Sequence, residues 1–194
     1  MKQRKMIICA VLMLVFAYVY AHVAKTNLIY DKKLDSSDYI GLGIVQTTIE
    51  QEFICKEDNL DAIAVKCQLL GAAEGTKIHM VLKECASGSV VATVDADDIE
   101  IENGKFHTFS FETVSGCRNK SYRASFEIEG AAGLVIQPET QDDTKLIIGG
   151  EEKEGTLILK TVTNRFDLET YCVLLIILFF ISAFFRFLNR LFSR

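Results

Sequence analysis

Two apolar runs lie near opposite ends of the chain and enclose a charged middle. The first covers residues 6–24 and is interrupted only by His22, and the second covers residues 171–185. About 20 helical residues span the roughly 30 Å of hydrocarbon in a bilayer. The first run meets this length. The second meets it if Arg186 extends its charged end to the headgroups and residues 187–188 complete the span. The pattern predicts two transmembrane helices.

Charge is divided sharply along the chain. All 26 acidic residues lie between Asp31 and Glu169, and the charged residues outside that interval are basic. Basic flanks stay on the cytoplasmic side of a membrane, so we expect both termini in the cytoplasm and the middle outside the cell membrane. An acidic middle repels phosphates, which excludes nucleic acid as a partner and leaves the lipid bilayer as the first predicted one.

The first run has an alternative interpretation. Its basic start, its apolar stretch and the sequence VYA at residues 19–21 also suit a signal peptide cut after Ala21. An uncleaved anchor is favoured because the stretch is long for a signal-peptide core. Both interpretations place the middle outside. We therefore predict an anchor or signal peptide over residues 1–24, and a transmembrane helix with a basic cytoplasmic tail over residues 166–194.

Apolar residues alternate with polar ones through much of the middle. They occupy every second position in five short segments: Ile63, Val65, Cys67 and Leu69; Ile78, Met80 and Leu82; Val90, Ala92 and Val94; Phe109 and Phe111; and Tyr122, Ala124, Phe126 and Ile128. A period of two predicts strands with one buried and one solvated face, and glycine-rich turns separate the segments. The sequence predicts an all-β fold, an antiparallel β-sandwich or jelly roll over residues 44–165, entered through a juxtamembrane stalk over residues 25–43.

The stretch DADDIEIENGKFHTF combines acidic residues with a turn signal. Asn103–Gly104 is typical of a type I′ turn, so Ile99 and Ile101 are expected in one strand of a hairpin. Three carboxylates before that strand are weak candidates for calcium ligands: Asp95, Asp97 and Asp98. Their spacing matches no calcium loop, and a solvated bend is the favoured interpretation. No cofactor and no other metal site is predicted.

Four cysteines lie in the predicted exported part: Cys55, Cys67, Cys85 and Cys117. An oxidising compartment allows three pairings among them. Cys55 and Cys67 are in phase with apolar strand positions and are expected to face the core, whereas Cys85 and Cys117 fall in turns. A Cys55–Cys67 bridge and a Cys85–Cys117 bridge both stay open as hypotheses. The spacings resemble no zinc motif.

The sequence carries no catalytic signature. Its three histidines are His22, His79 and His107, and the last two are expected on the solvated faces of strands. No serine lies in a nucleophile elbow, no glycine-rich loop precedes a helix, and no His-Glu metal pair occurs. We therefore predict that the protein is not an enzyme and has no catalytic residues.

Residues 45–130 resemble the exported β-sandwich segments of Gram-positive bacterial membrane proteins associated with cell-surface polysaccharide synthesis. The matching positions are Gln51 and Phe53, Asp58–Asn59–Leu60 and Ile63, Leu82 and Glu84, Gly88 with Val90 and Val91, Ala96 and Ile99, Asn103–Gly104, Phe109 and Phe111, and Ser121, Tyr122 and Phe126. The resemblance implies a galactose-binding-like jelly roll. In the family such domains are often attached to glycosyltransferase-like proteins. This chain has two hydrophobic runs and no transferase portion, which favours an accessory.

Two functions remain open from the sequence. The first is a non-catalytic, membrane-anchored assembly subunit that docks to an envelope-biosynthesis complex. The alternative is a membrane-tethered module that binds glycan or a lipid-linked saccharide. Sugar sites usually present aromatic faces beside polar groups, and this chain has no tryptophan. Tyr39 and Phe106 are the aromatic residues expected to be exposed, and the ligand-binding residues are otherwise unknown.

Overall fold

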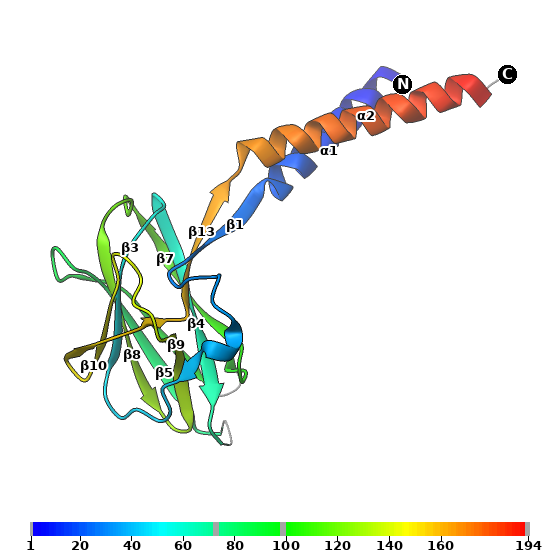
Figure 1. Cartoon of the computed structure of the whole chain (residues 1–194). Helices are drawn as coiled ribbons and strands as arrows, with labels where there is room; N and C mark the ends of the chain where they lie inside the picture. The colour runs from blue at the N-terminus through cyan, green and yellow to red at the C-terminus, as the bar shows by residue number, and fades with distance from the viewer. Residues whose placement is uncertain (1, 72–73, 98–99, 193–194) are drawn as a thin grey trace. The chain divides into compact units, whose positions relative to one another are not determined.

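The computed structural model describes residues 2–71, 74–97 and 100–192 (Figure 1). The chain divides into two compact units, one of residues Lys25–Thr163 and one of residues Met1–Ala24 with Asn164–Arg194. The elements in chain order are α1 (Lys2–Tyr20), β1 (His22–Leu28), η1 (Ser36–Asp38), β2 (Ile40–Gly41), β3 (Ile49–Ile54), β4 (Asn59–Leu69), β5 (Lys77–Glu84), β6 (Val90–Asp97), β7 (Phe106–Ser115), β8 (Ser121–Glu129), β9 (Ala132–Gln137), β10 (Lys145–Ile148), β11 (Glu151–Lys153), β12 (Thr156–Leu157), β13 (Leu159–Phe166) and α2 (Leu168–Phe192).

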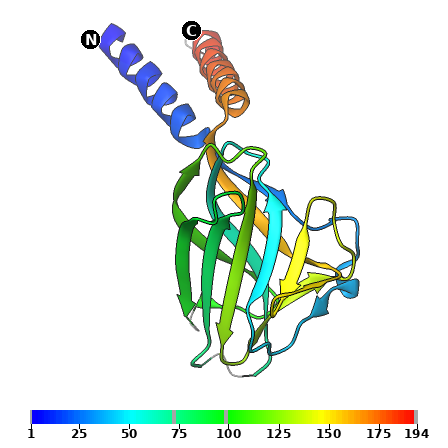
Figure 2. The same ribbon diagram turned by 90° about the vertical axis from the view of Figure 1, so that its left-hand side faces the viewer.

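The described strands form two sheets. The large sheet has the order β1-β13-β4-β9-β12, with β2 paired to β9 and β7 paired to β4. The small sheet has the order β11-β10-β3-β8-β5-β6. Figure 2 looks onto the small sheet, where cyan β3 lies between yellow-green β8 and yellow β10. The pairings β3–β8, β5–β8 and β4–β7 are antiparallel. The predicted antiparallel β-sandwich is therefore confirmed.

The core lies between the two sheets and follows the predicted alternation. Phe126 on β8 and Phe109 on β7 are fully buried, and their ring centroids lie 5.8 Å apart. The inward positions of β5 are also fully buried: Ile78, Met80 and Leu82. Gln51 is a buried polar exception on β3, where its Oε1 accepts a 2.8 Å hydrogen bond from the backbone N–H of Leu157. This bond connects the small sheet to β12 of the large sheet.

Two local expectations are wrong. A β-bulge between Leu82 and Lys83 shifts the β5–β6 register, so Val90 is 55% exposed instead of facing the core. The expected hairpin around Asn103–Gly104 is absent from the described residues, because Ile101 and Glu102 before the turn form no strand, and Ile99 lies outside those residues. The Asn103 side chain instead accepts a 3.0 Å hydrogen bond from the N–H of Leu69. Tertiary contacts with the end of β4 thus override the local turn signal.

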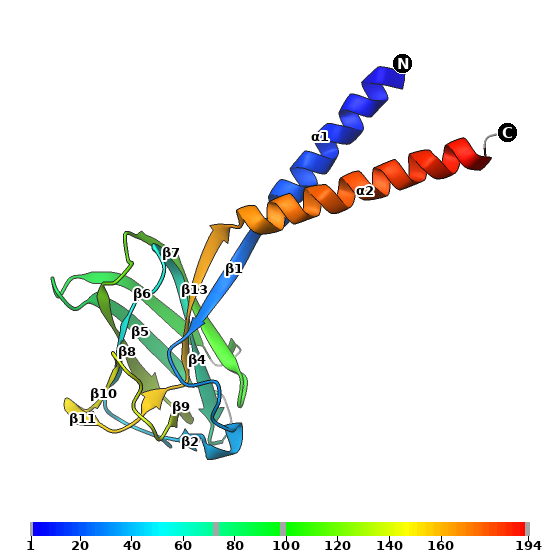
Figure 3. The ribbon, with the colours of Figure 1, turned by 45° about the horizontal axis from the view of Figure 1, so that its top comes forward.

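The segment predicted as a stalk contains two strands. The last residues of β1 belong to this segment, and β1 lies beside β13. β2 pairs with β9, where Ile40 stands opposite Ile136. Figure 3 shows β1 and β13 side by side. Residues 25–43 are therefore part of the larger compact unit, and the connection between β1 and β2 runs along the large sheet.

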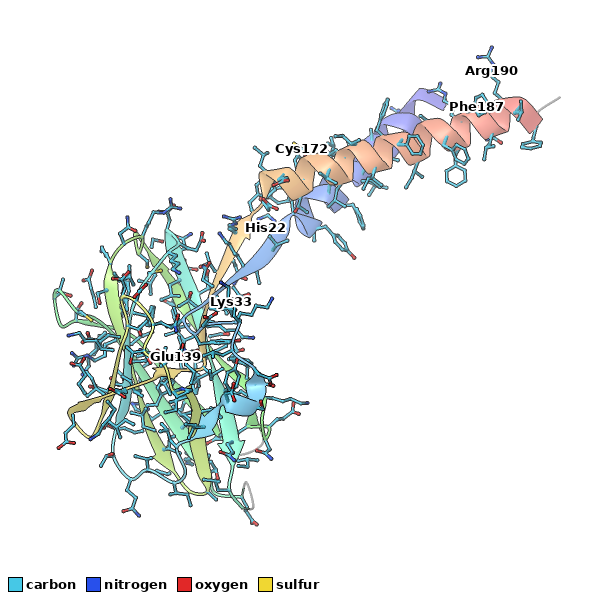
Figure 4. The ribbon with its side chains drawn as sticks, in the orientation of Figure 1. His22, Lys33, Glu139, Cys172, Phe187 and Arg190 are labelled. Carbon is cyan, nitrogen blue, oxygen red and sulfur yellow. The ribbon has the colours of Figure 1, made fainter. Side chains whose placement is uncertain are left out.

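The second apolar run lies within a helix. The first is helical up to Tyr20, and its residues 22–24 begin β1 instead. α2 has 25 residues, about 37 Å of helix, and is long and apolar enough to cross a membrane. Figure 4 shows Cys172 near its beginning and Arg190 near its end. Among the described residues α2 alone meets this criterion, since the apolar helix within α1 covers only Ala10–Tyr20. The second predicted span and the topology therefore stay predictions.

Candidate functional site

Three aromatic and two basic side chains gather on the outer face of the large sheet. We call this set the aromatic–lysine platform: Tyr30, Tyr39, Phe106, Lys66 and Lys160. Each is half-buried. They come from the β1–β2 connection, from β4, from the beginning of β7 and from β13, so the platform exists only in the folded protein.

Tyr30 is the central aromatic residue of the platform. Its ring stacks on that of Phe106 with a centroid separation of 6.3 Å and an interplanar angle of 23°. Its ring also meets Tyr39 edge to face, with centroids 6.1 Å apart. Burial raises the pKa of Tyr30, and the neighbouring Tyr39 raises it further. The Tyr30 hydroxyl therefore keeps its proton at neutral pH and can donate a hydrogen bond to a ligand.

Each lysine of the platform lies over an aromatic face. The Nζ atom of Lys160 lies 3.5 Å from the Phe106 ring centroid, and that of Lys66 lies 5.2 Å from the Tyr39 centroid. Both distances are within the range of a cation–π interaction. Burial lowers the pKa of Lys160, and the positive charge of Lys66 lowers it further. The two ammonium groups therefore repel one another across the platform.

Strand register explains how the platform forms. Lys66 on β4 stands directly opposite Phe106 on β7, and Lys160 on β13 stands opposite Ala64 on β4. Side chains two positions apart on a strand share a face, so Ala64 and Lys66 both point outward. Because Ala64 carries only a methyl group, the long side chain of Lys160 can cross β4 and reach the Phe106 ring.

An edge groove of about 590 Å³ lies next to the platform and shares Tyr30 with it. Its other polar lining residues are Asp31, Lys56, Asn119, Gln141, Asp142, Asp143 and Thr144. Two labels in Figure 4 help to locate the groove. Lys33 is two residues after the groove residue Asp31, and Glu139 is two residues before the groove residue Gln141. The groove offers amide, carboxylate and ammonium groups beside a tyrosine.

The weak calcium candidates lie on the opposite side of the sandwich. Asp95 and Asp97 line a groove of about 510 Å³ on the small sheet, together with Lys77, His79 and two glutamates. The His79 ring contacts the Asp95 carboxylate, and Lys77 Nζ lies 3.9 Å from Asp97 Oδ1. Asp98 lies outside the described residues. Within the described ranges no group of histidine, cysteine and carboxylate side chains is arranged to hold a metal ion. Calcium binding stays an untested hypothesis.

The four cysteines of the sandwich are free thiols, and the structure brings two of them together. Cys55 and Cys117 are both buried, and the backbone of Cys55 is hydrogen-bonded to Asn119 and Lys120 in the turn that contains Cys117. Cys67 faces the core, as expected, and Cys85 is exposed in the turn after β5. The contact thus joins one member of each pair considered from the sequence.

The sequence identified two of the five platform residues. Tyr39 and Phe106 were the expected exposed aromatics, and the structure places both against Tyr30. Tyr30 was missed because its segment reads as a stalk. Lys66 and Lys160 carried a usable signal, since both occupy outward positions in alternating strands. No sequence rule predicts that outward lysines from β4 and β13 meet the same aromatic cluster.

Comparison with known proteins assigns this chain to no family. No protein-family model matches the chain, and no curated protein matches it. Similar solved structures include the clostridial cysteine protease Cwp84 after propeptide cleavage, with 10% identity, a TM-score of 0.49, and coverage of 73% of this chain and 40% of that chain. The xylan-binding module CBM15 has 10% identity, a TM-score of 0.31, and coverage of 75% and 99%. Xylanase10C from Cellvibrio japonicus has 11% identity, a TM-score of 0.33, and coverage of 73% and 27%.

This chain spans about two fifths of the length of the Cwp84 structure. At such TM-scores and identities these likenesses decide neither the fold nor the function. The fold rests on this chain's own strand pairings, and the candidate function rests on its own side chains.

Proposed function

We propose that this chain is a membrane-tethered, non-catalytic module that binds a saccharide on the aromatic–lysine platform. The observation that carries the proposal is the convergence of Tyr30, Tyr39 and Phe106 with two lysines on one accessible sheet face. Aromatic faces pack against the C–H faces of sugar rings, while neighbouring polar groups hydrogen-bond to hydroxyls. The platform gathers three aromatic rings beside two ammonium groups, and the edge groove adds polar groups next to one of those rings, Tyr30.

The charges on the platform favour an acidic saccharide. The sandwich is acidic overall, yet Lys66 and Lys160 are close enough for the charge of one to lower the pKa of the other. A carboxylate or phosphate placed between the two ammonium groups would relieve this repulsion and gain two charge-assisted hydrogen bonds. A polysaccharide with uronate or phosphate groups and the phosphate of a lipid-linked saccharide share this chemistry.

The tether is the remaining part of the proposal. α2 is long enough to anchor the module, and we place α1 in the same membrane as a second span. With the basic ends of both helices in the cytoplasm, the sandwich faces the outside, where cell-surface polysaccharide is found. This location is the one implied by the resemblance to exported domains of polysaccharide-synthesis proteins.

The assembly function remains a second candidate because of one observation. An apolar cavity of about 450 Å³ lies between α1 and α2, lined by Met13, Leu175, Phe179 and other apolar side chains. Helices that leave such a space between them can pack against a further helix in the bilayer. A subunit of that kind would position an envelope-biosynthesis complex without a ligand of its own.

A glycan array separates the two candidates. The full chain is reconstituted in lipid nanodiscs, because alkyl-glycoside detergents would themselves compete for a sugar site. We expect binding to saccharides, strongest for those with carboxylate or phosphate groups. The double variant Lys66→Gln and Lys160→Gln removes both charges of the platform. Its matched control is Lys83→Gln on the small sheet. An array on which wild type binds no more than the double variant contradicts the saccharide function.

A further inference from the structure

Cys55 and Cys117 lie far apart in sequence and together in space. Cys55 follows β3 of the small sheet, and Cys117 lies in the turn between β7 and β8. Both side chains are buried, with exposures of 1% and 0%. No strand pairing joins these positions. The contact is therefore made by two turns that fold against each other.

Backbone hydrogen bonds fix the two turns in this arrangement. The N–H of Cys55 donates to the carbonyl of Lys120 at 2.9 Å, and the N–H of Asn119 donates to the carbonyl of Cys55 at 2.8 Å. The N–H of Cys117 donates to the carbonyl of Asp58 at 2.9 Å. The first two bonds hold the segment after β3 against the turn that contains Cys117. Such fixed proximity is the geometric condition for a disulfide.

The surroundings do not suit a reactive or metal-binding thiol. The Cys55 thiol donates to the carbonyl of Glu57 at 3.4 Å, and the Cys117 thiol donates to the carbonyl of Val114 at 2.9 Å. These partners contribute no positive charge to stabilise a thiolate, and burial raises the pKa of Cys55. The pair thus resembles a structural cross-link more than a catalytic site.

We propose that Cys55 and Cys117 form a structural disulfide in the mature protein, made while the chain folds. The oxidant is a disulfide of the form R–S–S–R. One cysteine thiolate attacks it and releases R–S⁻, and the second thiolate attacks the mixed disulfide and releases the other R–S⁻. An S–S bond forms between the cysteines, two protons leave their thiols, and the oxidant gains two electrons to become two thiols.

The bridge has a consequence for the edge groove. Lys56 and Asn119, which line the groove, lie one and two residues from the bridged cysteines. The link would tie the end of β3 to the β7–β8 turn and so join the two sheets at this end of the sandwich. Because the cross-linked loop is long, it also removes much entropy from the unfolded chain. The proposal stands independently of saccharide binding.

Refolding tests the proposal directly. The full chain is unfolded in urea with reductant, refolded in a glutathione redox buffer, and digested without reduction for mass spectrometry. We expect one cross-linked peptide pair containing Cys55 and Cys117, and four remaining thiols from the six cysteines. Six free thiols, or a cross-link that involves Cys67 or Cys85 in its place, would overturn the proposal.

Thermal melting gives a second test, with a matched control. Reduction should lower the Tm of wild type by about 10 °C, as expected for a bridge that closes a long loop. The Cys85→Ser variant should respond to reduction as wild type does, since Cys85 is exposed and outside the bridge. The double variant Cys55→Ser and Cys117→Ser should not respond. A wild-type Tm that is insensitive to reduction contradicts a stabilising bridge. If the double variant fails to fold, peptide mapping of wild type remains the test of the bridge.

Discussion

The ammonium group of Lys160 lies 3.5 Å from the centre of the Phe106 ring, although the two residues are on strands that do not pair. Lys160 reaches the ring from β13 across Ala64 of β4. This contact ties three strands of the large sheet together on its outer face. It also holds the Phe106 ring and the Lys160 ammonium in fixed positions, as a preformed binding surface requires.

A double-mutant cycle measures this contact. Phe106→Leu keeps an apolar side chain, and Lys160→Gln removes the charge. We expect a coupling free energy of about 0.5–1 kcal/mol between the two positions in urea unfolding of the four proteins, because a cation over a half-exposed ring gains that much. Additive effects, with a coupling indistinguishable from zero, would show that the ammonium and the ring do not interact in solution.

Acid should weaken a contact between β5 and the turn before β8. The Glu84 carboxylate accepts a 2.7 Å hydrogen bond from Ser87 Oγ, and Lys120 Nζ lies 3.0 Å from it. The Ser87 bond, followed by Lys120, lowers the pKa of Glu84 from its ordinary value of 4.5. The unfolded chain therefore binds the proton more tightly, so this stabilisation is present above pH 4.5 and is lost as pH falls through the lowered folded-state pKa.

Melting curves of wild type and Glu84→Gln from pH 7 to pH 3 test the pH effect. The variant should melt lower at pH 7, and the difference should shrink as the medium becomes acidic. Glu112→Gln, at an exposed position on β7, serves as the control. A difference between wild type and Glu84→Gln that stays constant across the range would contradict the shift.

Cys85 is a native probe of membrane topology. Its thiol is exposed, whereas Cys67 is fully buried and burial raises the pKa of the Cys67 thiol to about 12. A membrane-impermeant maleimide at pH 7.5 should therefore label Cys85 on intact cells and leave Cys67 unmodified. Because Cys172 near the beginning of α2 is also exposed, the labelling is done in a Cys172→Ser background, where Cys85→Ser should abolish it. Labelling that requires cell lysis would place the sandwich in the cytoplasm.

The sequence predicted the layers of this fold better than their connections. Alternation in residues 78–82 and 122–126 identified the buried faces, because a period of two leaves no other choice once one face is apolar. It did not predict that β6 and β7 lie in different sheets, because Asn103–Gly104 carries a strong local turn signal. The Asn103 side chain accepts a hydrogen bond from the N–H of Leu69, and this contact depends on the whole fold.

The site was predictable only in part, for a similar reason. An outward position says that Lys66 and Lys160 are solvated, but strand order decides what they lie beside. The contact between Cys55 and Cys117 likewise depends on two turns that no pattern places together. Alternation predicts which face of a sheet a side chain occupies. The order of the strands decides which side chains lie beside it.

Saccharide affinity of the platform variants tests the account most directly. For the acidic saccharide that binds best on the array, calorimetry with the nanodisc-embedded chain should show that Phe106→Ala weakens binding at least about tenfold, equivalent to about 1.4 kcal/mol. Val90→Ala, an exposed apolar position on the small sheet, should leave the affinity unchanged. Equal affinity of wild type and Phe106→Ala would contradict the assignment of the platform as the binding surface.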